Sequence, residues 1–161
     1  MSLPLNNIEK VLSRLRKQLP EGSKFFESNP LITPKKEYSL VKFILGEGNK
    51  RKALISAGIH GDEPSGIESI CAFLESNQFE KFSDEWELTF LPCLNPYGYE
   101  YGTRENHEGN DLNRHFKDEV PPHEVAFAKS ILENFYELTI ELHEDFMSSG
   151  YYLYQLGTHP E

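Results

Sequence analysis

Apolar residues recur at helical spacing in three stretches of the chain. In residues 8–19 they occupy every third or fourth position, with arginine and lysine between them, which predicts an amphipathic helix. Pro20 and Gly22 follow this stretch and are expected to end the helix. The same spacing predicts a second helix that opens at Pro64, since proline is tolerated in a first turn, and a third helix over residues 121–135.

Shorter runs rich in apolar, β-branched and aromatic residues separate these helices and predict strands. The strands are expected over residues 38–45, 52–57, 86–94, 138–142 and 151–156. The Gly-Glu-Gly-Asn sequence at 46–49 predicts a hairpin-like connection between the first two, and the polar stretch 95–115 predicts a long functional loop. Strands that alternate with helices predict an α/β fold, a three-layer α/β/α sandwich with a mixed sheet covered on both faces.

Length and charge narrow the possible functions. A chain of 161 residues is long enough to bury a core and predicts one domain over residues 1–161. The net charge of −10, from 26 acidic and 16 basic residues, argues against binding to nucleic acid or anionic lipid. It does not exclude a small anionic substrate, because a few arginines can form a local positive pocket.

The cellular context is also predicted from the sequence. The first residues lack the basic start and apolar run of a signal peptide, and no apolar stretch is long enough to span a bilayer. Cys71 and Cys93 are too few for a disulfide framework. We expect a cytoplasmic protein with two reduced, buried thiols, and a single disulfide bridge remains the alternative.

Three potential metal ligands follow two of the predicted strands. His60 and Glu63 come after the strand over residues 52–57, and His143 comes after the strand over 138–142. Sites in open α/β sheets lie beyond the carboxyl ends of strands, so these side chains are expected to meet. Two imidazoles and a carboxylate bind Zn²⁺ and leave a fourth position open, which is typical of a catalytic zinc.

A His-x-x-Glu pair alone is weak evidence, since it also occurs on solvated faces and at helix N-termini. The residues between the ligands strengthen the hypothesis, because they form a series of motifs. The order is His-Gly-Asp-Glu from His60, Asn-Pro-x-Gly from Asn95, Gly-Thr-Arg from Gly102, Asp-Leu-Asn-Arg from Asp111, and x-Leu-His ending at His143. Over residues 56–156 this order resembles the zinc carboxypeptidase family. It is most similar to the short bacterial branch that includes murein-peptide amidases, and the succinylglutamate desuccinylase and aspartoacylase branch shares much of the pattern.

The resemblance implies roles for the motif residues. The two histidines and Glu63 match the family's zinc ligands. Arg104 matches the arginine that polarises the scissile carbonyl and stabilises the oxyanion, while Asn113 and Arg114 match the pair that grips the substrate's terminal carboxylate. The chemistry is suitable, since a guanidinium offers a planar two-pronged grip that cannot lose its proton. Asp111 is expected to orient Arg114 or a zinc histidine, or to be a solvated loop acid.

The resemblance further implies the N-terminal portion of a zinc-carboxypeptidase-like domain, and one part of the site is missing. The family's general-base glutamate lies on a later strand, and the printed sequence reaches no matching position. Glu144 and Asp145 are next to His143 and therefore poorly placed to act as the base.

The implied function is a zinc-dependent hydrolase that cleaves an amide bond adjacent to a free carboxylate, as a carboxypeptidase does, with murein peptides as candidate substrates. The first alternative is an N-acyl amino acid deacylase of the succinylglutamate desuccinylase/aspartoacylase type. The second is a zinc- and carboxylate-binding domain that lacks its general base. The expected substrate is a small peptide or an N-acyl amino acid with a free carboxylate.

Overall fold

A five-stranded mixed sheet forms the middle layer of the computed structural model, which describes residues 3–148, 150, 152–155 and 157. The strands lie in the order β1 (Lys24–Glu27), β4 (Val41–Leu45), β6 (Trp86–Leu91), β5 (Arg51–Ala57) and β7 (Leu138–Leu142). β5 is parallel to both of its neighbours, β6 and β7. β4 is antiparallel to β6, and β1 is antiparallel to β4. The predicted mixed sheet is therefore confirmed.

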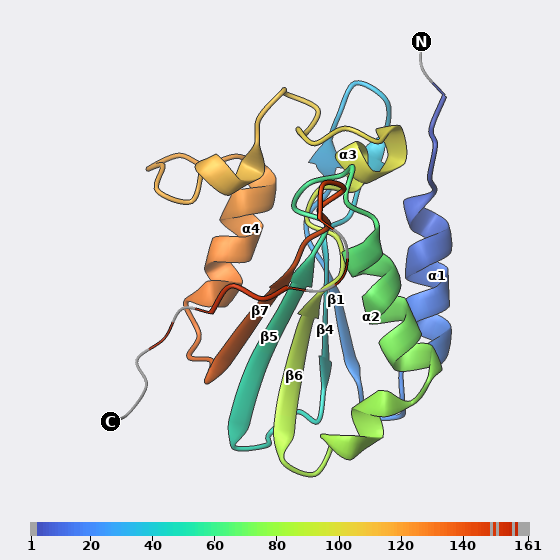
Figure 1. Ribbon diagram of the computed structural model, residues 1–161, viewed down its shortest axis with the longest axis vertical. Coiled ribbons are helices and arrows are strands. Elements are labelled where there is room, and N and C mark those ends of the chain that lie inside the picture. Colours follow the sequence, from blue (N-terminus) through green and yellow to red (C-terminus); the bar gives the residue numbers. More distant parts are fainter. Residues whose placement is uncertain (1–2, 149, 151, 156, 158–161) are drawn as a thin grey trace.

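Helices cover both faces of this sheet, as the three-layer prediction requires (Figure 1). One face carries α1 (Ile8–Gln18) and α2 (Ser65–Glu75), and the other carries α4 (His123–Leu132). Asn7 caps the start of α1, because its side chain accepts a hydrogen bond from the Lys10 amide and so satisfies an otherwise free donor. The three helices predicted from apolar spacing are present, and those predicted over residues 8–19 and 121–135 are shorter than expected.

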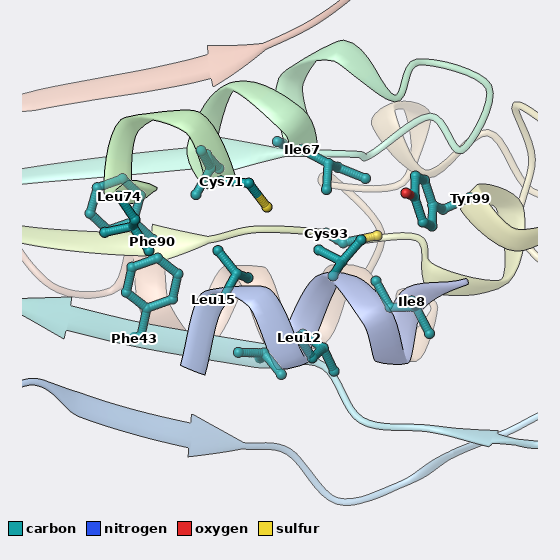
Figure 2. Close-up of a cluster of buried hydrophobic side chains, with 14 of the residues drawn as sticks. Ile8, Leu12, Leu15, Phe43, Ile67, Cys71, Leu74, Phe90, Cys93 and Tyr99 are labelled. Atoms are coloured by element: carbon teal, nitrogen blue, oxygen red, sulfur yellow. The ribbon is translucent and has the colours of Figure 1, made fainter. Parts of the chain in front are cut away.

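Each face has its own apolar core. Figure 2 shows the larger core, where Leu12 and Leu15 of α1 gather with Leu74 of α2 above the sheet. In the same core the rings of Phe43 and Phe90 stack with their centroids 4.7 Å apart. On the opposite face, α4 packs against side chains of β5 and the end of β6. That second core contains Leu54, Ile59, Leu91, Leu94, Leu112, Val125, Ala128 and Ile131.

The predicted hairpin between residues 38–45 and 52–57 is wrong. β6 lies between β4 and β5, so that Phe90 pairs with Phe43 on one side and with Ile55 on the other. The reason is the crossover: α2 carries the chain from β5 back to a strand parallel to it, and β4 then pairs with the free edge of β6. Gly46, at φ 63°, begins the connection from β4 to β5.

Several short elements were not predicted. They are β1, β2 (Leu31–Ile32), β3 (Glu37–Tyr38, of which only Tyr38 lay in a predicted strand), η1 (Gln78–Lys81), α3 (Pro96–Tyr101) and η2 (Leu112–Arg114). β2 and β3 pair with each other, so the strand predicted over 38–45 is divided between two sheets. The strand predicted over residues 151–156 is wrong for residues 152–155, which are irregular and exposed, while 151 and 156 lie outside the described residues.

β7 forms one edge of the sheet in the described part of the chain, where it pairs only with β5. Its side chains Leu138 and Ile140 are 45% and 37% exposed. Next to them, an apolar groove of about 360 Å³ runs between α2 and the sheet. Cys71 and Cys93 are both buried free thiols. Among the described residues, no helix combines the length and apolar content needed to cross a membrane.

Candidate metal centre

The three predicted metal ligands meet at the carboxyl ends of two neighbouring strands. His60 and Glu63 lie on the turn that leads from β5 to α2, and His143 follows β7 directly. Because β5 and β7 are parallel and pair up to Ala57 and Leu142, their ends bring the three side chains together. The ligand atoms all lie within 4.8 Å of one another.

The Glu63 carboxylate lies between the two imidazoles. Its Oε1 is 2.7 Å from His60 Nδ1, and its Oε2 is 2.7 Å from His143 Nδ1. Oε2 also accepts a hydrogen bond from the Glu144 amide at 3.1 Å. Burial by itself would raise the pKa of Glu63, but the Glu144 amide and the two histidines outweigh it and lower that pKa. Glu63 is therefore ionised at neutral pH, as a metal ligand must be.

A carboxylate stands behind each histidine. His60 Nε2 is 3.3 Å from Asp111 Oδ1, and His143 Nε2 is 3.6 Å from Glu141 Oε1. Metal-binding histidines commonly donate their second ring N–H to such a carboxylate, which fixes the ring and its tautomer. Glu141, with Glu63 adding to its effect against the opposing effect of burial, raises the pKa of His143 to about 9. The donor set and the orientation of both rings fit one Zn²⁺.

Arg104 lies beside this cluster. Its Nη1 donates to Glu63 Oε1 at 3.4 Å and its Nε to Asp111 Oδ2 at 3.2 Å. Burial would raise the pKa of Asp111, but Arg104, together with His60 and the Asn113 amide, outweighs it and lowers that pKa. The Arg104 carbonyl accepts from the side chain of Asn95, whose own oxygen accepts from the Gly98 amide and begins α3. Asn95 thus joins two of the sequence motifs.

Asn113 and Arg114 lie at the exposed rim of the site, in η2. The backbone amide of Asn113 donates to Asp111 Oδ1 at 3.1 Å. Arg114 Nε is 3.8 Å from Asp111 Oδ2, and its side chain is 78% exposed. The structure thus brings Arg104 into contact with the ligand cluster, whereas Asn113 and Arg114 approach it through Asp111.

The profile of the succinylglutamate desuccinylase/aspartoacylase catalytic domain matches residues 49–161 of this chain. The chain belongs to this family. The resemblance drawn from the motif order is thereby confirmed, since this is one of the two branches it indicated.

The chain is also similar to an amidase. The chain is 31% identical over 101 residues to murein peptide amidase A of Escherichia coli (strain K12), covering 63% of this chain and 38% of that protein. The chain thus spans well under half the length of this amidase.

Solved structures confirm the fold. A metallo-carboxypeptidase from Pseudomonas aeruginosa in complex with (2-guanidinoethylmercapto)succinic acid is similar with a TM-score of 0.72 at 18% identity, over 87% of this chain and 40% of that one. A succinylglutamate desuccinylase/aspartoacylase from Rhodobacter sphaeroides is similar with a TM-score of 0.62 at 18% identity, over 77% of this chain and 40% of that one.

Sequence reasoning missed Glu141 and left Asp111 open. Glu141 and His143 are two residues apart at the end of a strand, and the period of two along a strand was the available signal that they share a face. For Asp111, the structure shows contacts to a ligand histidine and to Arg104, which excludes a free solvated acid.

The two acids next to His143 point elsewhere. Glu144 Oε2 accepts from the Ser65 amide at 3.1 Å, at the start of α2. Asp145 accepts hydrogen bonds from the Met147 amide and from the hydroxyls of Ser148 and Tyr152. This agrees with the expectation that neither is placed to act as a general base.

Proposed function

We propose that this chain carries the metal-binding and substrate-binding portion of a zinc-dependent hydrolase that cleaves an amide bond next to a free carboxylate. The observation that carries the proposal is the convergence of His60, Glu63 and His143, with the Arg104 guanidinium 3.4 Å from Glu63. A cation beside the ligand cluster would suit amide hydrolysis, because negative charge develops on the carbonyl oxygen in the transition state.

The two histidines would hold the zinc through Nδ1, and Glu63 through its carboxylate. A zinc ion in such a site lowers the pKa of a bound water toward ~7 and polarises the substrate carbonyl. Asp111 and Glu141 keep the two rings oriented from behind. They would also raise the basicity of the imidazoles and so strengthen metal binding.

The two arginines would bind different groups of the substrate. Arg104 would donate to the carbonyl oxygen as it gains charge. Arg114, exposed at the rim with Asn113 beside it, would bind the free carboxylate through a two-pronged contact. Both arginines lie near the same oxygen of Asp111, since Arg104 Nε and Arg114 Nε are 3.2 and 3.8 Å from its Oδ2. We expect peptides of the murein type as the first substrates to test, given the similarity to the amidase of Escherichia coli.

The match to the desuccinylase/aspartoacylase profile favours a second candidate, the deacylation of N-acyl amino acids. Both reactions break an amide beside a carboxylate, so the same residues serve either one. The two substrate classes differ in which side of the scissile amide bond is large. A peptide substrate releases its single C-terminal residue from a large acyl part, whereas an N-acyl amino acid loses a small acyl group. Parallel assays with C-terminal peptides and with N-succinyl and N-acetyl amino acids separate them.

Metal analysis tests the centre itself. The purified protein should hold up to one zinc per chain, and His60→Ala should abolish stable binding, because two remaining ligands hold zinc weakly. His115→Ala is the matched control, since His115 contacts Asp118 and lies outside the cluster. Zinc content that persists in His60→Ala would refute the assignment. Zinc-loaded protein that binds carboxylates but cleaves neither substrate class would favour the non-catalytic binding domain.

A further inference from the structure

A fully buried carboxylate lies behind the loop that carries Arg104 and Asp111. Glu124, in the first turn of α4, is only 1% exposed. Its Oε1 accepts a hydrogen bond from Asn106 Nδ2 at 3.2 Å, and His107 Nδ1 is 4.0 Å from the same oxygen. Glu124 Oε2 and His107 Nδ1 are both buried without a hydrogen-bond partner among the described residues. A carboxylate in such a place costs stability, so packing alone does not account for a glutamate here.

We propose that Glu124 is a positioning residue that holds the segment 104–111, and through it Arg104 and Asp111, against the metal centre. The functional part of this inference rests on the proposed hydrolase activity. Glu124 itself contacts neither the ligand cluster nor the two arginines in the described structure, and it acts through Asn106.

Asn106 uses both ends of its side chain. Its amide nitrogen donates to Glu124, while its oxygen accepts from the backbone amides of Glu108 and Asn110 at 3.0 Å each. Two backbone bonds close the same turn: Asn106 donates to the Asn110 carbonyl, and Gly109 donates to the Asn106 carbonyl, both at 3.0 Å. Asn106 is therefore the centre of a closed loop, and its only side-chain link to a neighbouring element in the described structure is the bond to α4.

This closed loop determines where the two site residues lie. Arg104 precedes Asn106 by two residues, and Asp111 directly follows Asn110, so closing the loop brings Arg104 Nε to Asp111 Oδ2 at 3.2 Å. Asp111 in turn reaches His60. A displacement of about 1 Å in catalytic groups can reduce rates ~10²-fold. A buried bond from a rigid helix is suited to prevent such a displacement.

The test compares two changes at one position. Glu124→Leu fills the space but removes the acceptor, whereas Glu124→Gln keeps an oxygen for Asn106 Nδ2. Glu133→Gln, at the exposed C-terminal end of α4, is the matched control. In zinc-loaded protein, amide hydrogen exchange at Gly109 and Asn110 should quicken at least tenfold in Glu124→Leu. It should stay within about twofold of the unaltered protein in Glu124→Gln and in the control.

The second readout is ligand binding. Affinity for (2-guanidinoethylmercapto)succinic acid should fall at least tenfold in Glu124→Leu and recover in Glu124→Gln. Zinc affinity should fall in Glu124→Leu by less than the ~10–100-fold expected when a carboxylate behind a metal-binding histidine is lost, because Asp111 keeps its charge and none of the three ligands lies on the loop, and it should recover in Glu124→Gln. A purely structural role would lower the melting temperature and leave exchange and affinity at the loop unchanged, which would overturn the proposal.

The two readouts separate this inference from the proposed function. If the unaltered protein does not bind the succinic acid probe, the substrate-binding proposal fails, while hydrogen exchange still decides the role of Glu124. If Glu124→Leu does not fold by circular dichroism, Glu124→Asp takes its place. It is one methylene shorter and should lose the bond to Asn106, with the same quickened exchange. Unchanged exchange in that variant would also overturn the proposal.

Discussion

Gly61 and Gly98 approach each other backbone to backbone, so that a Cβ on Gly61 would overlap the main chain of Gly98 and Tyr99. Gly61 is the second residue of the His-Gly-Asp-Glu motif, and Gly98 is the last of Asn-Pro-x-Gly. On its other side, Gly98 is crowded by the Asn95 side chain and the Thr103 carbonyl. The glycines in these motifs therefore allow the metal-ligand turn, α3 and the Arg104 segment to pack together.

Gly61→Ala should be strongly destabilising. The added methyl group meets backbone, which cannot move aside as a flexible side chain can, so the cost should reach or exceed the upper end of overpacking, about 3 kcal/mol. Thermal unfolding of zinc-free protein measures it without interference from metal binding. Gly157→Ala is the control, because its Cβ would meet nothing within 4 Å. Equal melting temperatures for the two variants would show that the close approach does not matter.

Local sequence patterns predicted the helices well and the strand pairing poorly. The apolar spacing over residues 8–19 depends on one helix alone, so it predicts that helix without knowledge of the rest of the fold. The pairing of Phe43 with Phe90 instead joins β4 and β6, which are separated in the chain by β5 and α2. The local spacing of apolar residues carries no information about such a pairing. α3 was missed for a different reason: Pro96 and Gly98 suggest a loop, but Asn95 caps a short helix there, with proline in its first turn.

The candidate site shows the same difference between features that follow from local sequence and contacts that join distant segments. His60, Glu63 and His143 could be predicted to meet because two of them lie in the turn after β5 and the third follows β7, and the ends of parallel strands converge by a general rule. Asp111 could not be assigned from sequence, because its contacts to His60 and Arg104 join three separate segments. Glu124 is further from any sequence signal, since its role depends on the fold placing the start of α4 behind the 104–111 segment.

Ile140→Lys should cost little stability and should weaken any association between copies of this chain along β7. The side chain is 37% exposed on β7, which has no second neighbour in the described structure, and an exposed apolar edge strand favours association. We expect a loss below about 1 kcal/mol, and a lower apparent mass at high concentration by sedimentation. Leu54→Lys, at a buried position of the neighbouring strand, should instead prevent folding. Unchanged association in Ile140→Lys would show that this edge does not mediate it.

Asp111→Asn should weaken zinc binding by ~10–100-fold, because the variant keeps the shape but loses the charge behind His60. It should also release Arg104, whose Nε donates to Asp111. Competition with a chelator measures zinc affinity in both forms. Asp118→Asn is the control, since Asp118 pairs with His115 outside the cluster. An affinity for zinc within twofold of the unaltered protein would mean that Asp111 only shapes the loop.

Changes at the two arginines should differ in kind. A substrate carboxylate is charged in the ground state and the transition state alike, so Arg114→Ala should raise KM and leave kcat nearly unchanged. The oxyanion exists only in the transition state, so Arg104→Ala should lower kcat by ~10²–10³. Steady-state kinetics on a carboxylate-bearing substrate separates the two effects.

Inhibitor binding tests the role of Arg114 without substrate turnover. Loss of a charged hydrogen bond of about 1.5–3 kcal/mol should weaken a carboxylate inhibitor by ~10–100-fold in zinc-loaded Arg114→Ala. Amidating the inhibitor's carboxylate should weaken its binding to the unaltered protein by a similar factor but should change little in Arg114→Ala, because the partner of that group is already gone. Lys117→Ala, an exposed cation three residues further along, should behave as the unaltered protein does. If free and amidated inhibitors bind the unaltered protein equally well, Asn113 and Arg114 do not form a carboxylate-binding pair, and the exposed guanidinium at the rim serves another purpose.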